Sequence, residues 1–233
     1  MFWQEKDDDK FVLNDDVVDV IFELKGTVVP IDHGYVLARE LIRQIPWFEH
    51  EAQCGLHQIH VAASGNGWER PEADQQGTMY ISRRTKLVLR LPKPRIAEAM
   101  NVLEGAELDL DGCVLTVGKS KTRPLSTLTT LFSRYVIADS PQDEGAFTRH
   151  VVAQLRDLDI RVRKLMCGKS SVLRTPDGDL HVRSVMLADL DVDESVRLQQ
   201  HGIGPGRHLG CGLFIPHKGI EAVSSKQSDG HKD

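Results

Sequence analysis

Glycine, arginine and histidine are concentrated in one short stretch near the end of this 233-residue chain. Five of the eleven residues from 202 to 212 are glycine. Glycine is costly to order, so such a cluster indicates positive φ angles or close approach of another backbone. An arginine and a histidine in its centre add charge and N–H donors, which suit a phosphate backbone. The candidate contacts are Gly204, Gly206, Arg207, His208 and Gly210.

An ordinary structural loop is the alternative explanation of this stretch. Gly202 is also suited to end a helix, and residues 204–206 to form a turn. A nucleotide-binding loop is less well supported. Glycines of the dinucleotide type follow a strand and open a helix, whereas these follow a predicted helix and precede a predicted strand. No lysine-serine or lysine-threonine pair of the phosphate-binding loop type closes the stretch either.

Basic residues recur in separate clusters although the net charge is −5. Arg83, Arg84 and Lys86 lie in a predicted strand, where alternation places Arg84 and Lys86 on one face. Further basic residues gather at 119–123 and 161–174. Such separated charge is compatible with a polyanion on one face, although each lysine alone is more typical of a solvated surface.

Cys54, His57 and His60 form a possible metal-ligand cluster. A structural zinc needs four ligands, usually from two separated pairs, and the chain offers no second pair. We therefore expect no metal or other cofactor. The four cysteines are scattered without a C-x-x-C spacing, which favours reduced, mostly buried thiols.

The elements that must position these residues follow a regular order. We predict strands at 17–24, 56–62, 78–91 and 107–117, and helices at 33–45 and 95–104, with Asp32 as the first N-cap. This is the βαββαβ order of a ferredoxin-like or RRM-like domain. The second half repeats it with strands at 125–138, 160–166, 181–190 and 213–216, and helices at 142–158 and 195–200.

The sequence thus predicts an α+β protein of two tandem ferredoxin-like domains with a C-terminal glycine-rich loop. The predicted divisions are a polar lead-in at 1–15, domains at 16–120 and 121–218, and a disordered tail at 219–233. With 40% hydrophobic and 27% charged residues the composition is that of a globular protein. No apolar run approaches the roughly 20 residues needed to cross a bilayer, and the start lacks a signal peptide. We expect no membrane partner and a cytoplasmic location.

Two such halves with a Gly-apolar-Gly, five residues, Gly-apolar-Gly loop before the last strand resemble a known family. They are similar to the CRISPR-associated endoribonucleases that cut precursor CRISPR RNA within its repeats, in the repeat-associated mysterious protein (RAMP) superfamily. The similarity is strongest over residues 196–216. A second point is the run from Pro30 to Tyr35, where the family commonly places its catalytic histidine.

The resemblance implies metal-independent cleavage of CRISPR repeat RNA. The ribose 2′-OH attacks the adjacent phosphate and leaves a 2′,3′-cyclic phosphate and a 5′-OH. On this basis His33 is the expected general base or acid, since a near-neutral imidazole suits either role. Tyr35 would orient the 2′-OH, and Arg39 and Arg43, on the same helix face, would offset phosphate charge.

Several alternatives to this assignment stay open. His33 could be a structural histidine at a helix start, and Tyr35 a half-buried residue beside two surface arginines. His208 could supply the acid, and the third catalytic residue is not identified. A non-catalytic RNA-binding subunit of a CRISPR effector complex would share the fold. A metal-dependent hydrolase has no paired carboxylate-histidine motif to support it.

Overall fold

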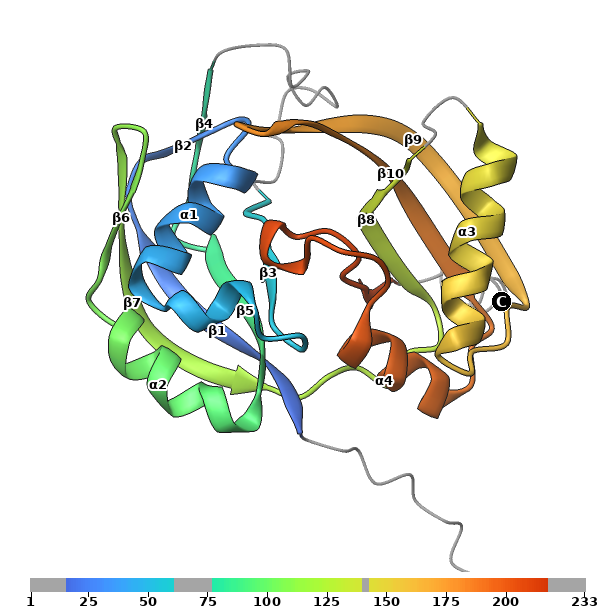
Figure 1. Ribbon diagram of the computed structural model, residues 1–233. Helices are drawn as coiled ribbons and strands as arrows, with labels where there is room; N and C mark the ends of the chain where they lie inside the picture. Colours follow the sequence, from blue (N-terminus) through green and yellow to red (C-terminus); the bar gives the residue numbers. More distant parts are fainter. Residues whose placement is uncertain (1–15, 61–76, 140–142, 218–233) are drawn as a thin grey trace, which may run out of the picture.

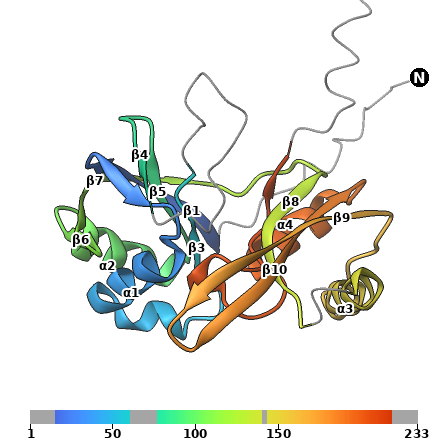
Figure 2. The ribbon, with the colours of Figure 1, turned by 90° about the horizontal axis from the view of Figure 1, so that it is seen from above.

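The computed structural model describes residues 16–60, 77–139 and 143–217. Within them the chain forms a mixed α+β fold built on antiparallel sheets (Figure 1). The predicted lead-in at 1–15 and the tail at 219–233 lie outside the described residues. Seen from above, the two larger sheets stand side by side (Figure 2). No helix in the described ranges is long and apolar enough to span a membrane.

The first sheet has the strand order β3-β5-β1-β7-β6, and all of its neighbours are antiparallel. Alternate residues of its central strand, Val18, Val20 and Phe22, lie in the first hydrophobic core and pair in register with leucines of β5. Helices α1 and α2 contribute leucines and alanines to the same core. The elements are β1 (Val17–Lys25), α1 (Gly34–Gln44), β3 (Gly55–His57), β5 (Lys86–Pro92), α2 (Lys93–Leu103), β6 (Glu107–Leu110) and β7 (Cys113–Arg123).

The second sheet has the order β11-β8-β10-β9 and is also antiparallel. Leu131 and Leu187 pair on the face covered by α3 and α4, in the second hydrophobic core. Helix α4 begins with a capping box, in which the Asp191 amide donates to the Glu194 carboxylate at 2.8 Å. The elements are β8 (Leu131–Ile137), α3 (Glu144–Asp157), β9 (Lys164–Thr175), β10 (Gly178–Ala188), α4 (Val192–His201) and β11 (Ile215–Pro216).

Short elements complete the fold. Strand β2 (Val28–Pro30) pairs with β4 (Thr78–Tyr80), and two 3-10 turns occur at η1 (Pro46–Glu49) and η2 (Arg207–Leu209). The long β9–β10 hairpin reaches over to the first half (Figure 1), where Leu173 and Val182 join the first core. The two halves therefore share apolar contacts.

Most predicted elements occur with shifted ends, and two predictions are wrong. The expected strand at 78–91 is divided by a turn, in which the Thr85 amide donates to the Ser82 carbonyl at 2.9 Å. Asp32 is not the cap of α1. His33 occupies that position, and Asp32 instead lies 3.8 Å from the Arg174 guanidinium. The strand predicted at 107–117 is a hairpin of β6 and β7, which turns at Asp111 and Gly112 with positive φ at both residues.

Candidate nucleic-acid interface

His33 lies at the start of α1 and is almost completely buried, with 1% of its surface exposed. The Ile59 amide donates to its Nε2 at 3.0 Å, so Nδ1 carries the proton and lies 2.9 Å from the Pro30 carbonyl. Both ring nitrogens are therefore occupied by the protein's own backbone. In this arrangement the imidazole exchanges a proton only by losing one of these hydrogen bonds.

The start of α1 and the glycine-rich loop both contact the segment that follows β3. A Cβ at Gly34 would lie 2.6 Å from the side-chain nitrogen Nε2 of Gln58. That same nitrogen donates to the Leu209 carbonyl at 2.9 Å, and a side chain at Gly210 would meet the Leu56 carbonyl at 3.0 Å. The two stretches that suggested the family are thus neighbours, although about 170 residues separate them along the chain.

The five glycines of residues 202–212 all have positive φ angles. The loop closes on itself, because the Ile203 amide donates to the Gly212 carbonyl at 3.1 Å. A Cβ at Gly212 would lie only 1.8 Å from the Ile203 carbonyl oxygen. Gly202 directly follows α4 as its C-cap. The fold alone therefore accounts for several of these glycines, while Gly204 is exposed and Gly206 and Gly210 are half-buried.

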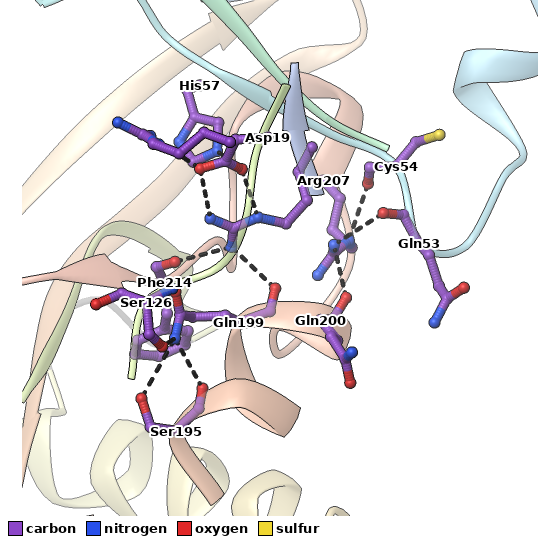
Figure 3. A network of polar contacts seen from close by, with 12 residues as sticks. Asp19, Gln53, Cys54, His57, Ser126, Ser195, Gln199, Gln200, Arg207 and Phe214 are labelled. Carbon is purple, nitrogen blue, oxygen red and sulfur yellow. Dashed lines mark hydrogen bonds and ion pairs between the residues drawn. The ribbon is translucent and has the colours of Figure 1, made fainter. Parts of the chain in front are cut away.

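Arg207 is buried, contrary to its predicted contact with a phosphate backbone. Its guanidinium donates to the carbonyls of Cys54, Gln53 and Gln200 at 2.9, 3.3 and 3.1 Å (Figure 3). Burial, together with the nearby Arg90 charge, lowers its pKa to about 10. Its donors are turned inward, so the side chain fastens the glycine-rich loop to the segment before β3.

A buried charged cluster next to Arg207 joins the two halves of the protein. Arg90 is fully buried and donates to Asp19 at 2.9 Å and to the carbonyls of Gln199 and Phe214 at 2.9 and 2.8 Å. His57 Nε2 lies 3.4 Å from the Asp19 carboxylate (Figure 3). Although burial opposes its charge, Arg90 and His57 hold the pKa of Asp19 well below its usual value.

The sequence carries a signal for this cluster that the predicted site residues do not include. Asp19 and Arg90 each interrupt a run of apolar residues, and they pair directly across β1 and β5. Charges within otherwise apolar strands are stable when buried only if they are paired. Two such interruptions in strands predicted to be neighbours therefore indicate an ion pair.

The predicted side chains on α1 are engaged within the protein. Tyr35 is half-buried against the first core. Arg39 lies 3.1 Å from Asp111, and Arg43 lies 2.9 Å from Glu40. These carboxylates neutralise the positive face that was predicted for the helix.

The remaining predicted residues fall in two other places. Arg83 and Arg84 are exposed in the turn between β4 and β5, not in a strand, so they do not alternate with Lys86 as predicted. Lys86 is half-buried, 3.9 Å from Glu23. His208 is half-buried in η2, and burial lowers its pKa, which nearby Glu49 partly offsets. The structure therefore does not gather all these residues into one site.

A shallow hollow of about 30 Å³ lies between β3 and the strands β8 and β11. It is lined by His57, Gln58, His60, Arg134 and Tyr135, with Gly210 of the glycine-rich loop. Arg134 and Tyr135 are not among the site residues predicted from the sequence. The hollow places imidazole, guanidinium and amide groups beside the segment that contacts both His33 and the loop.

The possible zinc ligands do not form a site. Within the described ranges, no three His, Cys, Asp or Glu side chains are placed to hold one metal ion. Cys54 is buried, and burial raises the pKa of its thiol to about 12, which disfavours the thiolate that binds zinc. All four cysteines are free thiols.

Comparison with known proteins adds to this description. A family model described as Cas6 (Cas6 Crispr) matches residues 18–219. The CRISPR-associated endonuclease Cas6 of Myxococcus xanthus (strain DK1622) is 28% identical over 199 residues, which cover 85% of this chain and 81% of that protein.

Two solved structures share the fold. One, described as a CRISPR associated protein Cas6, has a TM-score of 0.57 at 14% identity and covers 87% of this chain and 100% of its own. The other, described as a RAMP protein binding different RNA substrates, has a TM-score of 0.59 at 15% identity and covers 85% and 98%.

Proposed function

This chain belongs to the Cas6 family, and we propose that it is an endoribonuclease that cleaves precursor CRISPR RNA within its repeats. The observation that carries the proposal is the family match over residues 18–219. The similarity to a curated CRISPR-associated endonuclease over most of both chains supports it. The resemblance suggested by the glycine-rich loop and the Pro30 to Tyr35 run is confirmed by this family match.

The fold proposed with this function is a pair of tandem ferredoxin-like domains. The strand orders support it. When β6 is set aside and the four remaining strands of each large sheet are numbered along the chain, both sheets have the spatial order 4-1-3-2. Each half also supplies two helices between its strands in the order βαββαβ. We propose domain boundaries at 16–120 and 121–218, with the protein acting in the cytoplasm.

The proposed chemistry is metal-independent attack of a ribose 2′-OH on the adjacent phosphate, giving 2′,3′-cyclic phosphate and 5′-OH ends. The reaction needs a base, an acid and donors for the phosphorane. His33 remains our candidate for base or acid and Tyr35 its partner. For His33 to act, the hydrogen bond from the Ile59 amide must open so that Nε2 becomes accessible.

The second candidate is a non-catalytic RNA-binding subunit of a CRISPR effector complex. One observation favours it, the burial of His33 with both ring nitrogens hydrogen-bonded to backbone. A structural histidine would have this environment. In this alternative the same RNA is bound, together with other protein subunits, but it is not cut.

Cleavage of labelled repeat RNA in the presence of EDTA separates these functions. The endoribonuclease cuts in EDTA, and its 5′ product carries a 2′,3′-cyclic phosphate that resists phosphatase until acid opens it. The RNA-binding subunit retains the RNA uncut. Cutting that EDTA abolishes would refute both, because it would require a metal.

A further inference from the structure

Helices α3 and α4 cover one face of the second sheet. Leu131, Val185 and Leu187 lie in the core beneath α3 and α4. Since side chains alternate along a strand, Phe132 and Met186 point to the opposite face. Close to the β9–β10 turn that face packs against the first core through Leu180 and Val182. Farther along the strands its described side chains are exposed or half-buried.

One row of apolar side chains crosses this open part on all four strands. Phe132 pairs in register with Ile215 of β11 and with Met186 of β10, and Met186 pairs with Met166 of β9. Met166 is 64% exposed, and the other three are half-buried. We call Ile215, Phe132, Met186 and Met166 the open-face row. Exposed apolar surface of this kind is typical of a binding site.

Cationic and imidazole groups surround the aromatic ring of this row. The Arg134 guanidinium lies 5.8 Å from the Phe132 ring centroid, and the His217 ring centroid lies 5.9 Å from it. Arg134 and His217 are both exposed. Arg134 and Phe132 also line the hollow beside β3, together with His60. The surroundings of the ring therefore attract anions.

We propose that the open-face row stacks unpaired bases of the RNA substrate, while Arg134 and His217 contact the phosphates beside them. The inference rests on the proposed RNA-processing function and adds the surface that holds single-stranded nucleotides. Aromatic side chains on the open face of a four-stranded sheet stack bases in this manner, since every base has a π face. Four strands span about 14 Å at the usual spacing, which accommodates two or three bases.

A protein partner is the less favoured occupant of this surface. A stable protein interface involves roughly 20 or more residues on each side, whereas the row has four members. Charge is also concentrated next to the aromatic ring, where protein interface cores are depleted of charge. A flexible chain of bases and phosphates matches alternating apolar and cationic groups better.

The test measures binding of repeat RNA and of an unstructured oligouridine of equal length by Phe132→Ala, Phe132→Trp and Arg134→Ala. We expect Phe132→Ala to weaken binding of both RNAs roughly 5- to 150-fold, which corresponds to loss of one stacked base. Phe132→Trp retains or improves it. Arg134→Ala lowers the slope of log K against log salt by about 0.7 on oligouridine. Val102→Ala and Arg149→Ala are matched controls, located on α2 and α3.

A fluorescent base distinguishes stacking from a general loss of structure. When oligouridine contains one 2-aminopurine, the fluorescence of that base should be quenched on binding to wild type and to Phe132→Trp, and less on binding to Phe132→Ala. If Phe132→Ala does not fold, Phe132→Trp and Arg134→Ala still decide the matter. Wild-type affinity and salt slope in both Phe132→Ala and Arg134→Ala would overturn the inference, as would a Phe132→Ala defect confined to association with another protein.

The wild-type protein provides the check on the function beneath this inference. If wild type neither binds nor cuts repeat RNA, the proposed function fails. If wild type binds or cuts repeat RNA and the Phe132 and Arg134 variants behave like it, only the stacking surface is refuted.

Discussion

The amide nitrogen of Ile59 lies 3.0 Å from Nε2 of His33 and donates a hydrogen bond to it. This bond connects the start of α1 to the segment after β3, which also contacts the glycine-rich loop through Gln58. A single imidazole therefore occupies the position expected of the catalytic group and also stabilises the junction of three chain segments.

We predict that His33→Ala destabilises the protein whether or not the ring takes part in catalysis. Removing the ring leaves the Ile59 amide and the Pro30 carbonyl without their partner, at a cost of about 1–3 kcal/mol for each buried group. Urea unfolding at pH 7 measures this loss, and His150→Ala, on the exposed side of α3, is the control. An unfolding free energy equal to that of wild type would contradict the observed hydrogen bonds.

The same variant separates the catalytic from the structural role. If His33 is the base or acid, the folded fraction of His33→Ala cuts repeat RNA roughly 100-fold or more slowly while it still binds. If the role is structural, the rate per folded molecule stays at the wild-type value. His33→Gln, whose amide can accept the Ile59 hydrogen bond, should recover stability without recovering a catalytic rate.

We predict that replacing Arg207 changes stability without changing the salt dependence of RNA binding. Its guanidinium donates to three carbonyls and is buried, so Arg207→Ala removes internal hydrogen bonds and no phosphate contact. Arg207→Lys loses most of the same stability, because an ammonium does not present the planar fork. Filter binding of repeat RNA across a salt series, with unfolding curves on the same samples, is the measurement. If the slope of log K against log salt is lower by about one in Arg207→Ala, Arg207 contacts a phosphate as predicted from the sequence.

We predict that Arg90→Ala destabilises the protein by about 3–5 kcal/mol, because the buried Asp19 loses one of its two guanidinium partners at 2.9 Å and keeps only Arg123, which is 56% exposed. The Gln199 and Phe214 carbonyls lose their donor in the same variant, so the contact between the two halves weakens as well. Arg43→Ala is the matched control, since its ion pair with Glu40 leaves Arg43 59% exposed. Such helix pairs contribute about 0.3–0.5 kcal/mol. If the two variants lose similar free energies of unfolding, burial does not make the ion pair of Arg90 more important for stability than the exposed pair of Arg43.

Periodicity predicted the elements well but could not place the charges. The apolar alternation of β1 and the helical stripe of α1 follow directly from which faces must be buried, and both elements occur where expected. The break at Ser82 to Thr85 depends on a local side-chain and backbone turn inside a strand-like composition. Arg207 was expected at the surface because arginine usually is. Its burial depends on carbonyls from segments about 150 residues away, which sequence spacing does not reveal.

We predict that Gly212→Ala is far more damaging than Gly105→Ala, although both glycines have positive φ. At Gly105 a Cβ meets nothing within 4 Å, so only the left-handed backbone cost of about 1–2 kcal/mol applies. At Gly212 the added carbon would lie 1.8 Å from the Ile203 carbonyl oxygen, and the loop must open. Thermal unfolding of both variants measures the difference. Equal melting temperatures would show that the loop is not closed as described.

We predict that the protein loses stability as the pH falls below about 6.5. Burial lowers the pKa of His57, and the charges of Arg90 and Arg123 lower it further, while Asp19 offsets only part of this shift. Burial also lowers the pKa of His208. The unfolded chain then binds more protons than the folded one between the folded pKa values and the ordinary value near 6.5. The free energy of unfolding therefore rises with pH through this interval and is fully developed above it.

The charge on Asp19 does not produce this slope. Its pKa lies well below the ordinary value, so its contribution is present above about pH 4 and is lost only in stronger acid. Urea unfolding at intervals from pH 5 to pH 7.5 should show the loss in wild type and a flatter profile in His57→Gln. Glu49 and His50 are the titratable groups that act on His208, and His208→Gln should flatten the rest of the pH profile. A double variant with the wild-type slope would mean that neither imidazole is held neutral by burial.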